Sequence, residues 1–225
     1  MEYLGRIDSD VRAIVIAGSG KVFSAGLDMN SAMGMQELKD SAEDPARSAI
    51  KFFDVLRPLQ EGISSLEKVR VPVIAAIHGY CIGAGVDVVS ACDIRYAAKG
   101  TKFTIKEIDL GLASDVGVLQ RFPKTVGNDS WARELAFTAR YFDEKEALKN
   151  GFISKVSDTP EQCLADAIAL AKLIASKSPV AVTTTKQSLI YSRDHNVQAG
   201  LDHICWLNSA MLQTNDTQNA AMASF

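Results

Sequence analysis

The chain has 225 residues, of which 47% are hydrophobic, so it is long enough to bury one substantial core. Its formal net charge of -3 provides no broad basic field, which argues against nucleic-acid binding. The apolar runs fall well short of a bilayer span, so we expect a soluble protein that does not bind membranes.

The first half of the chain alternates predicted strands with predicted helices. Four apolar stretches predict strands at residues 12–17, 71–77, 93–98 and 102–105. Over residues 46–67, apolar side chains recur every three or four positions and predict an amphipathic helix, which Pro58 should kink or divide. A shorter helix is predicted from Gly85 to Ala91. This alternation indicates an α/β sheet covered by helices.

Helical patterns dominate from residue 130 onward. They predict helices over residues 131–139, 143–149, 161–176 and 180–194. We therefore expect two regions, an α/β core over residues 1–129 and an α-helical C-terminal region over residues 130–225.

Two glycine-containing turns follow predicted strands, SAGLD at residues 24–28 and GYCIGAG at residues 79–85. Each turn can present backbone N–H groups to a ligand. Such turns are common, and either one alone is more often a plain turn than a binding site. The second turn lacks the Gly-x-x-x-x-Gly-Lys pattern of a phosphate-binding loop, so a nucleotide site is disfavoured.

Beyond these turns, four segments carry a resemblance to the crotonase, or enoyl-CoA hydratase/isomerase, superfamily: KVFSAGLD at residues 21–28, PVIAAIHG at 72–79, GAGVD at 83–87 and CDIR at 92–95. The resemblance covers nearly the whole chain. It implies a crotonase-type spiral of ββα units followed by an α-helical trimerisation region. Family members usually carry one more strand and helix before the position of Arg12, and we expect that part of the core to be missing here.

The resemblance also implies an acyl-CoA thioester as substrate, held beside an oxyanion hole made by the backbone N–H groups of Leu27 and Ala84. Removal of a thioester α-proton yields an enolate, and two fixed donors stabilise its oxygen where charge develops. Coenzyme A is part of the substrate, so no separate cofactor and no metal are expected. The resemblance assigns substrate binding to Ala25, Gly26, Leu27, Asp28, Met29, Asn30 and Gly85.

Three acids distinguish the branches of the superfamily: Asp87, Glu107 and Asp115. A family hydratase typically has Glu at position 87 and a small residue near 115. The chain resembles the dienoyl-CoA isomerases in its two aspartates, Asp87 and Asp115, and in the segment KEIDLGLASDVG at residues 106–117. That resemblance implies conversion of 3,5-dienoyl-CoA to 2,4-dienoyl-CoA in the β-oxidation of unsaturated fatty acids.

The reaction explains why several acids are needed, because a proton leaves C2 and another is returned at the distant C6. By resemblance Asp115 serves C2 and Glu107 serves C6, although the reverse assignment is left open. Asp87 lies in the first turn of its predicted helix, where the helix dipole favours the ionised form, and we expect it to tune or orient the other two. At least one of the three acids should hold a proton at neutral pH.

Two alternatives remain open at this point. The first is a different reaction on acyl-CoA, either enoyl-CoA hydration or 3,2-enoyl-CoA isomerisation. The second is a CoA-binding scaffold that keeps the fold without turnover. The products formed from a panel of acyl-CoA substrates distinguish the dienoyl-CoA isomerase from the other reactions. Binding of an acyl-CoA without conversion would indicate the scaffold.

The tail and the location of the protein are interpreted by resemblance as well. A helical tail that cannot bury its apolar stripe alone needs a partner surface, and we expect a homotrimer or a hexamer of two trimers. The resemblance favours mitochondria or peroxisomes, although neither end of the chain shows a targeting signal.

Overall fold

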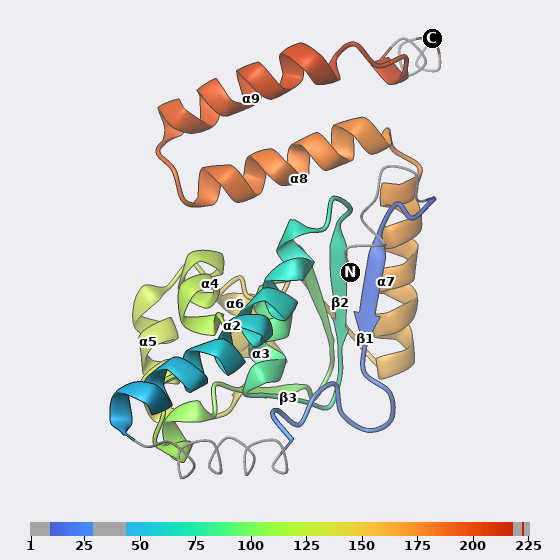
Figure 1. The fold of residues 1–225 in the computed structure, drawn as a ribbon. Coiled ribbons are helices and arrows are strands. Elements are labelled where there is room, and N and C mark those ends of the chain that lie inside the picture. Colours follow the sequence, from blue (N-terminus) through green and yellow to red (C-terminus); the bar gives the residue numbers. More distant parts are fainter. Residues whose placement is uncertain (1–9, 29–43, 218–221, 223–225) are drawn as a thin grey trace.

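The computed structural model describes residues 10–28, 44–217 and 222 (Figure 1). Its main sheet is parallel, with strand order β1-β2-β4-β7, and consists of β1 (Ile14–Ala17), β2 (Val73–Ile77), β4 (Ile94–Ala98) and β7 (Lys155–Ser157). A second sheet has the order β3-β5-β6 and consists of β3 (Tyr80–Ile82), β5 (Lys102–Thr104) and β6 (Phe142–Asp143). The predicted α/β architecture is therefore confirmed, and all four predicted strands form.

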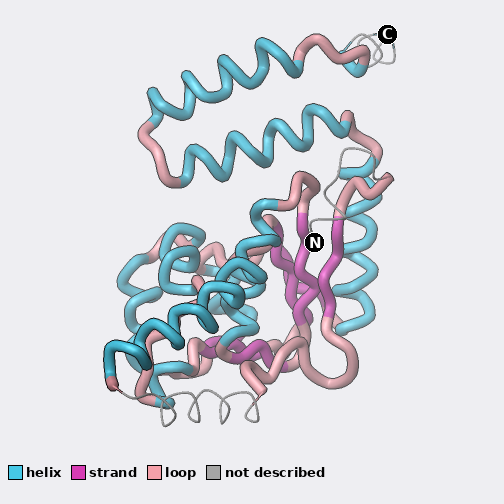
Figure 2. The backbone as a smooth tube through the Cα atoms, in the orientation of Figure 1, coloured by secondary structure: helices cyan, strands magenta, loops and turns pink. Residues whose placement is uncertain are grey.

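Helices surround these sheets (Figure 2). They are α2 (Pro45–Lys68), α3 (Ala84–Ser90), α4 (Val118–Thr125), α5 (Asp129–Thr138), α6 (Glu144–Lys149), α7 (Pro160–Ala175), α8 (Pro179–Arg193) and α9 (Val197–Met211), with the short 3-10 helix η2 (Glu107–Leu110). Of the two predicted effects of Pro58, the division is wrong, because α2 continues through it, and the kink stays a prediction. Asp44 caps its first turn, and Leu66 in its last turn is buried in the core.

β2 lies in the middle of the core and is buried on both faces. Val73, Ala75 and Ile77 belong to the larger apolar cluster, which includes residues of α2, α3 and α4. Ile74 and Ala76 point to the opposite face, where they pack against α7. A strand covered on both faces reads as a continuous apolar run, and this explains the sequence of residues 73–77.

The region after residue 130 contributes to the sheets as well as to the helical layer. β7 pairs in parallel with β4, β6 pairs with β5, and α7 covers one face of the main sheet (Figure 1). Within the described part of this region, α8 and α9 lie apart from the sheets and pack against each other as a hairpin of helices. The division of the chain at residue 130 stays a prediction. Among the described residues, no helix is both long and apolar enough to cross a membrane.

Candidate active site

The two predicted turns meet at the ends of neighbouring parallel strands, β1 and β2. Ser24 forms a parallel bridge with Cys81, and its carbonyl oxygen accepts the Ile82 N–H at 3.1 Å. Gly85 is needed where the turns touch, because a Cβ on it would lie 2.7 Å from the Cβ of Ser24. The sheet thus brings together two loops that are far apart in the sequence.

The two amides assigned to the oxyanion hole lie in these turns. Gly83 has a φ of 51°, a conformation that favours glycine, and α3 begins at the next residue, Ala84. Leu27 follows Gly26, whose N–H donates to the Ser24 hydroxyl at 3.2 Å. Within the described part of the chain, the N–H groups of Leu27 and Ala84 have no hydrogen-bond partner, so both remain available as donors to a ligand.

The residues assigned to substrate binding lie mainly in the first turn. Ala25, Leu27 and Asp28 are exposed, whereas Gly85 is buried at the contact with Ser24. Met29 and Asn30 lie outside the described residues. The substrate-binding assignments stay predictions.

Asp87 is fully buried in the first turn of α3. Its Oδ1 accepts the Val118 N–H at 2.5 Å and so holds the start of α4, while its Oδ2 is buried without a hydrogen-bond partner. Burial is the main cause that raises the pKa of Asp87, to about 7, and the charges of Glu107 and Asp115 raise it further. The helix dipole was expected to favour the ionised form of Asp87, but the loss of solvation outweighs that effect.

Glu107 is half-buried at the start of η2, beside the second turn. Its Oε2 accepts a hydrogen bond from the Ser114 hydroxyl at 2.9 Å. Its Oε1 faces Gly83, where it would lie 3.0 Å from an added Cβ. The carboxylate is thus held next to the residue that precedes the Ala84 amide.

Asp115 is half-buried in the loop between η2 and α4. The side-chain amide of Gln60, on α2, donates to the backbone oxygen of Asp115 at 2.6 Å. Burial raises the pKa of Asp115. Because the charges of both Glu107 and Asp115 act on Asp87, the structure brings the three acids into one neighbourhood, although they come from α3, η2 and a loop.

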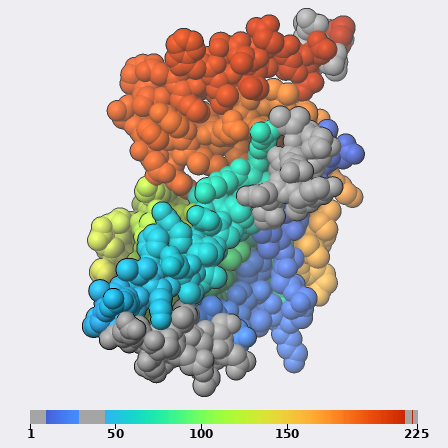
Figure 3. All heavy atoms as spheres, in the orientation of Figure 1, coloured from blue at the N-terminus to red at the C-terminus, as the bar shows by residue number. Residues whose placement is uncertain are grey.

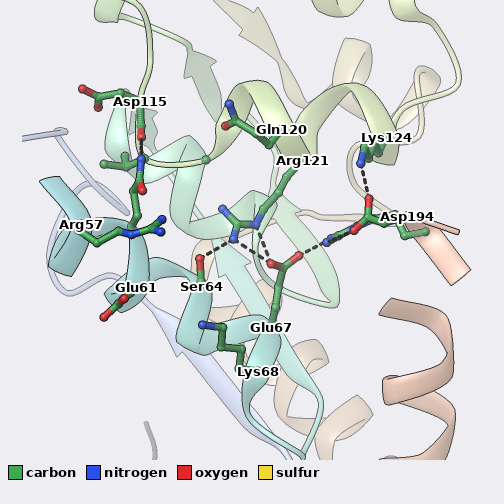
Figure 4. A pocket seen from close by; sticks show the side chains of 14 residues that line it. Arg57, Glu61, Ser64, Glu67, Lys68, Asp115, Gln120, Arg121, Lys124 and Asp194 are labelled. Atoms are coloured by element: carbon green, nitrogen blue, oxygen red, sulfur yellow. Dashed lines mark hydrogen bonds and ion pairs between the residues drawn. The ribbon is translucent and has the colours of Figure 1, made fainter. Parts of the chain in front are cut away.

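A polar pocket of about 490 Å³ lies on the other side of the Asp115 backbone, between α2, α4 and the end of α8 (Figure 4). Arg121 crosses it to bond Glu67 at 2.8 Å and Ser64 at 2.8 Å. The Asp115 carboxylate points away from this pocket. The pocket therefore belongs to the junction between the core and the C-terminal hairpin, and not to the site of the three acids.

Sequence reasoning did not identify Ser114 and Gln60 as residues that hold the acids. The segment containing Ser114 was noted only for its resemblance, since a bond from Ser114 back to Glu107 depends on how η2 and the next loop fold. The described residues contain no group of three or more His, Cys, Asp or Glu side chains that could hold a metal ion.

Comparison with known proteins identifies relatives of this chain. Residues 1–225 match the Enoyl-CoA hydratase/isomerase family. The mitochondrial Delta(3,5)-Delta(2,4)-dienoyl-CoA isomerase of Pongo abelii is 49% identical over 96% of this chain and 66% of that protein. The peroxisomal isomerase of the same name from Arabidopsis thaliana is 43% identical over 95% of this chain and 77% of that protein.

Solved structures of enoyl-CoA hydratases have the same fold as this chain. The enoyl-CoA hydratase of Bacillus anthracis superposes with a TM-score of 0.82 at 26% identity, covering 97% of this chain and 79% of that one. The chain spans 66% of the length of the mammalian isomerases it matches. The match over all 225 residues and the shared fold confirm the family that the sequence resembles. The chain therefore belongs to the enoyl-CoA hydratase/isomerase family.

Proposed function

We propose that this protein is a dienoyl-CoA isomerase that converts 3,5-dienoyl-CoA thioesters to the conjugated 2,4-isomers. The observation that carries the proposal is that the charges of Glu107 and Asp115 both act on the buried Asp87, while Glu107 lies beside the turn that presents the Ala84 amide. The 49% identical relative from Pongo abelii is named for this reaction, which supports the same activity here.

In the proposed mechanism, one ionised carboxylate removes the C2 proton and the electron pair spreads from C2 to C6 of the dienolate. The thioester oxygen gains negative charge, and the amides of Leu27 and Ala84 stabilise it. A protonated carboxyl then returns a proton to C6, so the double bonds move from positions 3 and 5 to positions 2 and 4. One proton is lost and one is gained, and no oxidation or reduction occurs.

Burial determines the proposed role of Asp87. With a pKa of about 7, Asp87 is protonated in a large fraction of the molecules at neutral pH. In those molecules the three neighbouring acids do not all carry a negative charge. A neutral Asp87 lowers the electrostatic cost of the ionised carboxylate that takes the C2 proton. We assign C2 to Asp115 and C6 to Glu107, and isotope exchange at C2 in variants of each acid would test that order.

The assembly and location of the protein are part of this proposal. Several large apolar side chains of α9 are exposed, including Val197, Leu201 and Trp206, and α8 exposes Leu189. A second chain is the partner that we propose for this surface, in a homotrimer or a hexamer of two trimers. The relatives named above are mitochondrial or peroxisomal, which supports the same compartments here.

The proposal is tested by adding a 3,5-dienoyl-CoA and following the absorbance of the conjugated product. Asp115→Asn keeps the shape of the side chain but removes its basicity, so kcat should fall by roughly 10²–10⁴-fold. Asp129→Asn, an exposed change at the start of α5, is the matched control and should keep full activity. An Asp115→Asn enzyme with normal turnover would refute the role of Asp115.

The same protein preparations separate the alternative functions. Addition of water to a 2-enoyl-CoA without bond migration would favour a hydratase. Migration of a single double bond in a 3-enoyl-CoA, with no activity on the diene, would favour a 3,2-isomerase. Tight binding of an acyl-CoA without any conversion would favour the scaffold reading.

A further inference from the structure

Ser114 is a buried polar residue next to the proposed acids, and none of the steps above uses it. Its side chain is 6% exposed, and its hydroxyl donates to Oε2 of Glu107 at 2.9 Å. A hydrogen bond to a charged carboxylate is stronger than one between neutral groups. Ser114 also directly precedes Asp115 in the chain, so this bond ties the loop that carries one acid to the side chain of another.

The surroundings fix both ends of this link. Glu107 is confined on its other side, because its Oε1 would lie 3.0 Å from a Cβ added to Gly83. That turn is itself fixed by a hydrogen bond from the Gly83 N–H to the backbone oxygen of Thr104 at 3.0 Å. The loop is fixed from α2, where the Gln60 side chain donates to the Asp115 backbone oxygen at 2.6 Å. The Ser114 hydroxyl therefore connects two anchored segments.

We propose that Ser114 is a positioning residue, whose hydroxyl sets the place and the proton affinity of the Glu107 carboxylate relative to Asp115. Transfer between C2 and C6 needs two acids at a fixed separation, and small displacements of such groups cost large factors in rate. A donor to a carboxylate stabilises the ionised form, and it therefore makes the protonated carboxyl a stronger acid toward C6. Ser114 thus acts through Glu107 and does not touch the reacting carbons.

The first test measures the contact and needs no turnover. The side-chain carboxyl carbons of glutamate are labelled with ¹³C, the Glu107 signal is assigned by its loss in Glu107→Gln, and its titration midpoint is measured. Loss of a charge-assisted donor in Ser114→Ala should raise that midpoint by about one pH unit. Ser114→Thr retains a hydroxyl and should restore the wild-type midpoint.

A matched control is available in Ser90, a second buried serine whose hydroxyl has no hydrogen-bond partner in the described part of the chain. Ser90→Ala removes the same atoms from a buried site without breaking such a bond, so the Glu107 midpoint should not move. An unchanged midpoint in Ser114→Ala, or an equal shift in Ser90→Ala, would overturn the proposal. Failure of Ser114→Thr to recover the midpoint would attribute the shift to packing, and would overturn it too.

The second test uses turnover and rests on the proposed function. Ser114→Ala should lower kcat about 10-fold with little change in KM, and the limb of the pH–rate profile that Glu107 controls should move to higher pH. A shifted midpoint with unchanged kcat and pH profile would refute the positioning role. If the wild-type protein converts no dienoyl-CoA but the midpoint still shifts, the proposed isomerase fails while the effect of Ser114 on Glu107 stands.

Discussion

The α/β core and the α8–α9 hairpin bury their apolar side chains to very different degrees. In the core, both faces of β2 are covered, and five aromatic rings pack together, those of Phe103, Phe122, Trp131, Phe142 and Phe152. In α9 only Gly200 is buried, and Trp206 is 80% exposed. Figure 3 shows the hairpin as a distinct layer that rests against one end of the molecule. The core therefore completes its packing within one chain, whereas the hairpin does not.

Polar contacts, rather than apolar packing, attach this hairpin to the core. On α8, the ammonium group of Lys186 is buried and bonds Asp93 at 2.7 Å and the backbone oxygens of Leu66 and Val71, each at 3.0 Å. Leu66 lies in the last turn of α2, where carbonyl groups lack partners within the helix. One cation thus satisfies the end of α2 and also holds α8 in place.

The largest stability effect should come from breaking this attachment. Lys186→Ala leaves Asp93 and two carbonyl oxygens without their donor, and the free energy of unfolding should fall by about 3 kcal/mol. Urea denaturation measures the change, with Lys172→Ala on the exposed side of α7 as the control. A loss below about 1 kcal/mol would show that the hairpin is held mainly by something other than Lys186.

The buried acid of the core offers a second test, through pH. The pKa of Asp87 is raised in the folded state to about 7, so its contribution to stability is fully present below the pKa of the unfolded chain and is lost as pH rises through about 7. Between pH 5 and pH 8 this amounts to about 2–3 kcal/mol. Asp87→Asn cannot ionise, so its unfolding free energy should lack this fall.

The measurement is denaturant unfolding of both proteins at several pH values. The difference between the two curves reports Asp87 together with its electrostatic coupling to Glu107 and Asp115, because the more distant titrating groups behave alike in both proteins. A wild-type curve parallel to that of the variant would mean that Asp87 is already ionised at pH 5, and the electrostatic role proposed for it would then be wrong.

The exposed surface of α9 provides a smaller and different effect. If a second chain covers it, Trp206→Glu places a charge in an apolar interface and should weaken association by about 2 kcal/mol, roughly 30-fold. Analytical ultracentrifugation across a range of concentrations measures this change. Lys177→Glu, an exposed charge reversal before α8, is the control. A wild-type protein that remains monomeric at high concentration would contradict the proposed assembly.

The contrast between the two regions also explains what the sequence could predict. β2 and α3 are encoded locally, by a continuous apolar run and by a glycine-rich turn, and both were found within one or two residues. β3, β6 and β7 have two or three residues each, too few to show a period, and they form because neighbouring strands pair with them. Short strands of this kind depend on the tertiary fold.

The same reasoning applies to the candidate site. The positions of Asp87, Glu107 and Asp115 were predicted from resemblance, but the protonation of Asp87 was not, because it depends on complete burial rather than on the helix it belongs to. The bond from Ser114 to Glu107 and the bond from Gln60 to Asp115 join residues whose proximity no local pattern signals. The sequence therefore indicates the candidate acids, whereas packing determines how they are held.

The smallest predicted effect concerns an exposed ion pair between the core and the hairpin, from Lys124 on α4 to Asp194 at the end of α8. Both side chains are more than 40% exposed, so water and salt screen their attraction, unlike that of Lys186. Lys124→Ala should therefore lower the unfolding free energy by about 0.5 kcal/mol in low salt and by less in 1 M NaCl. Equal losses of unfolding free energy in Lys124→Ala and Lys186→Ala at both salt concentrations would contradict this prediction. Burial would then not explain the difference in strength expected between the two ion pairs.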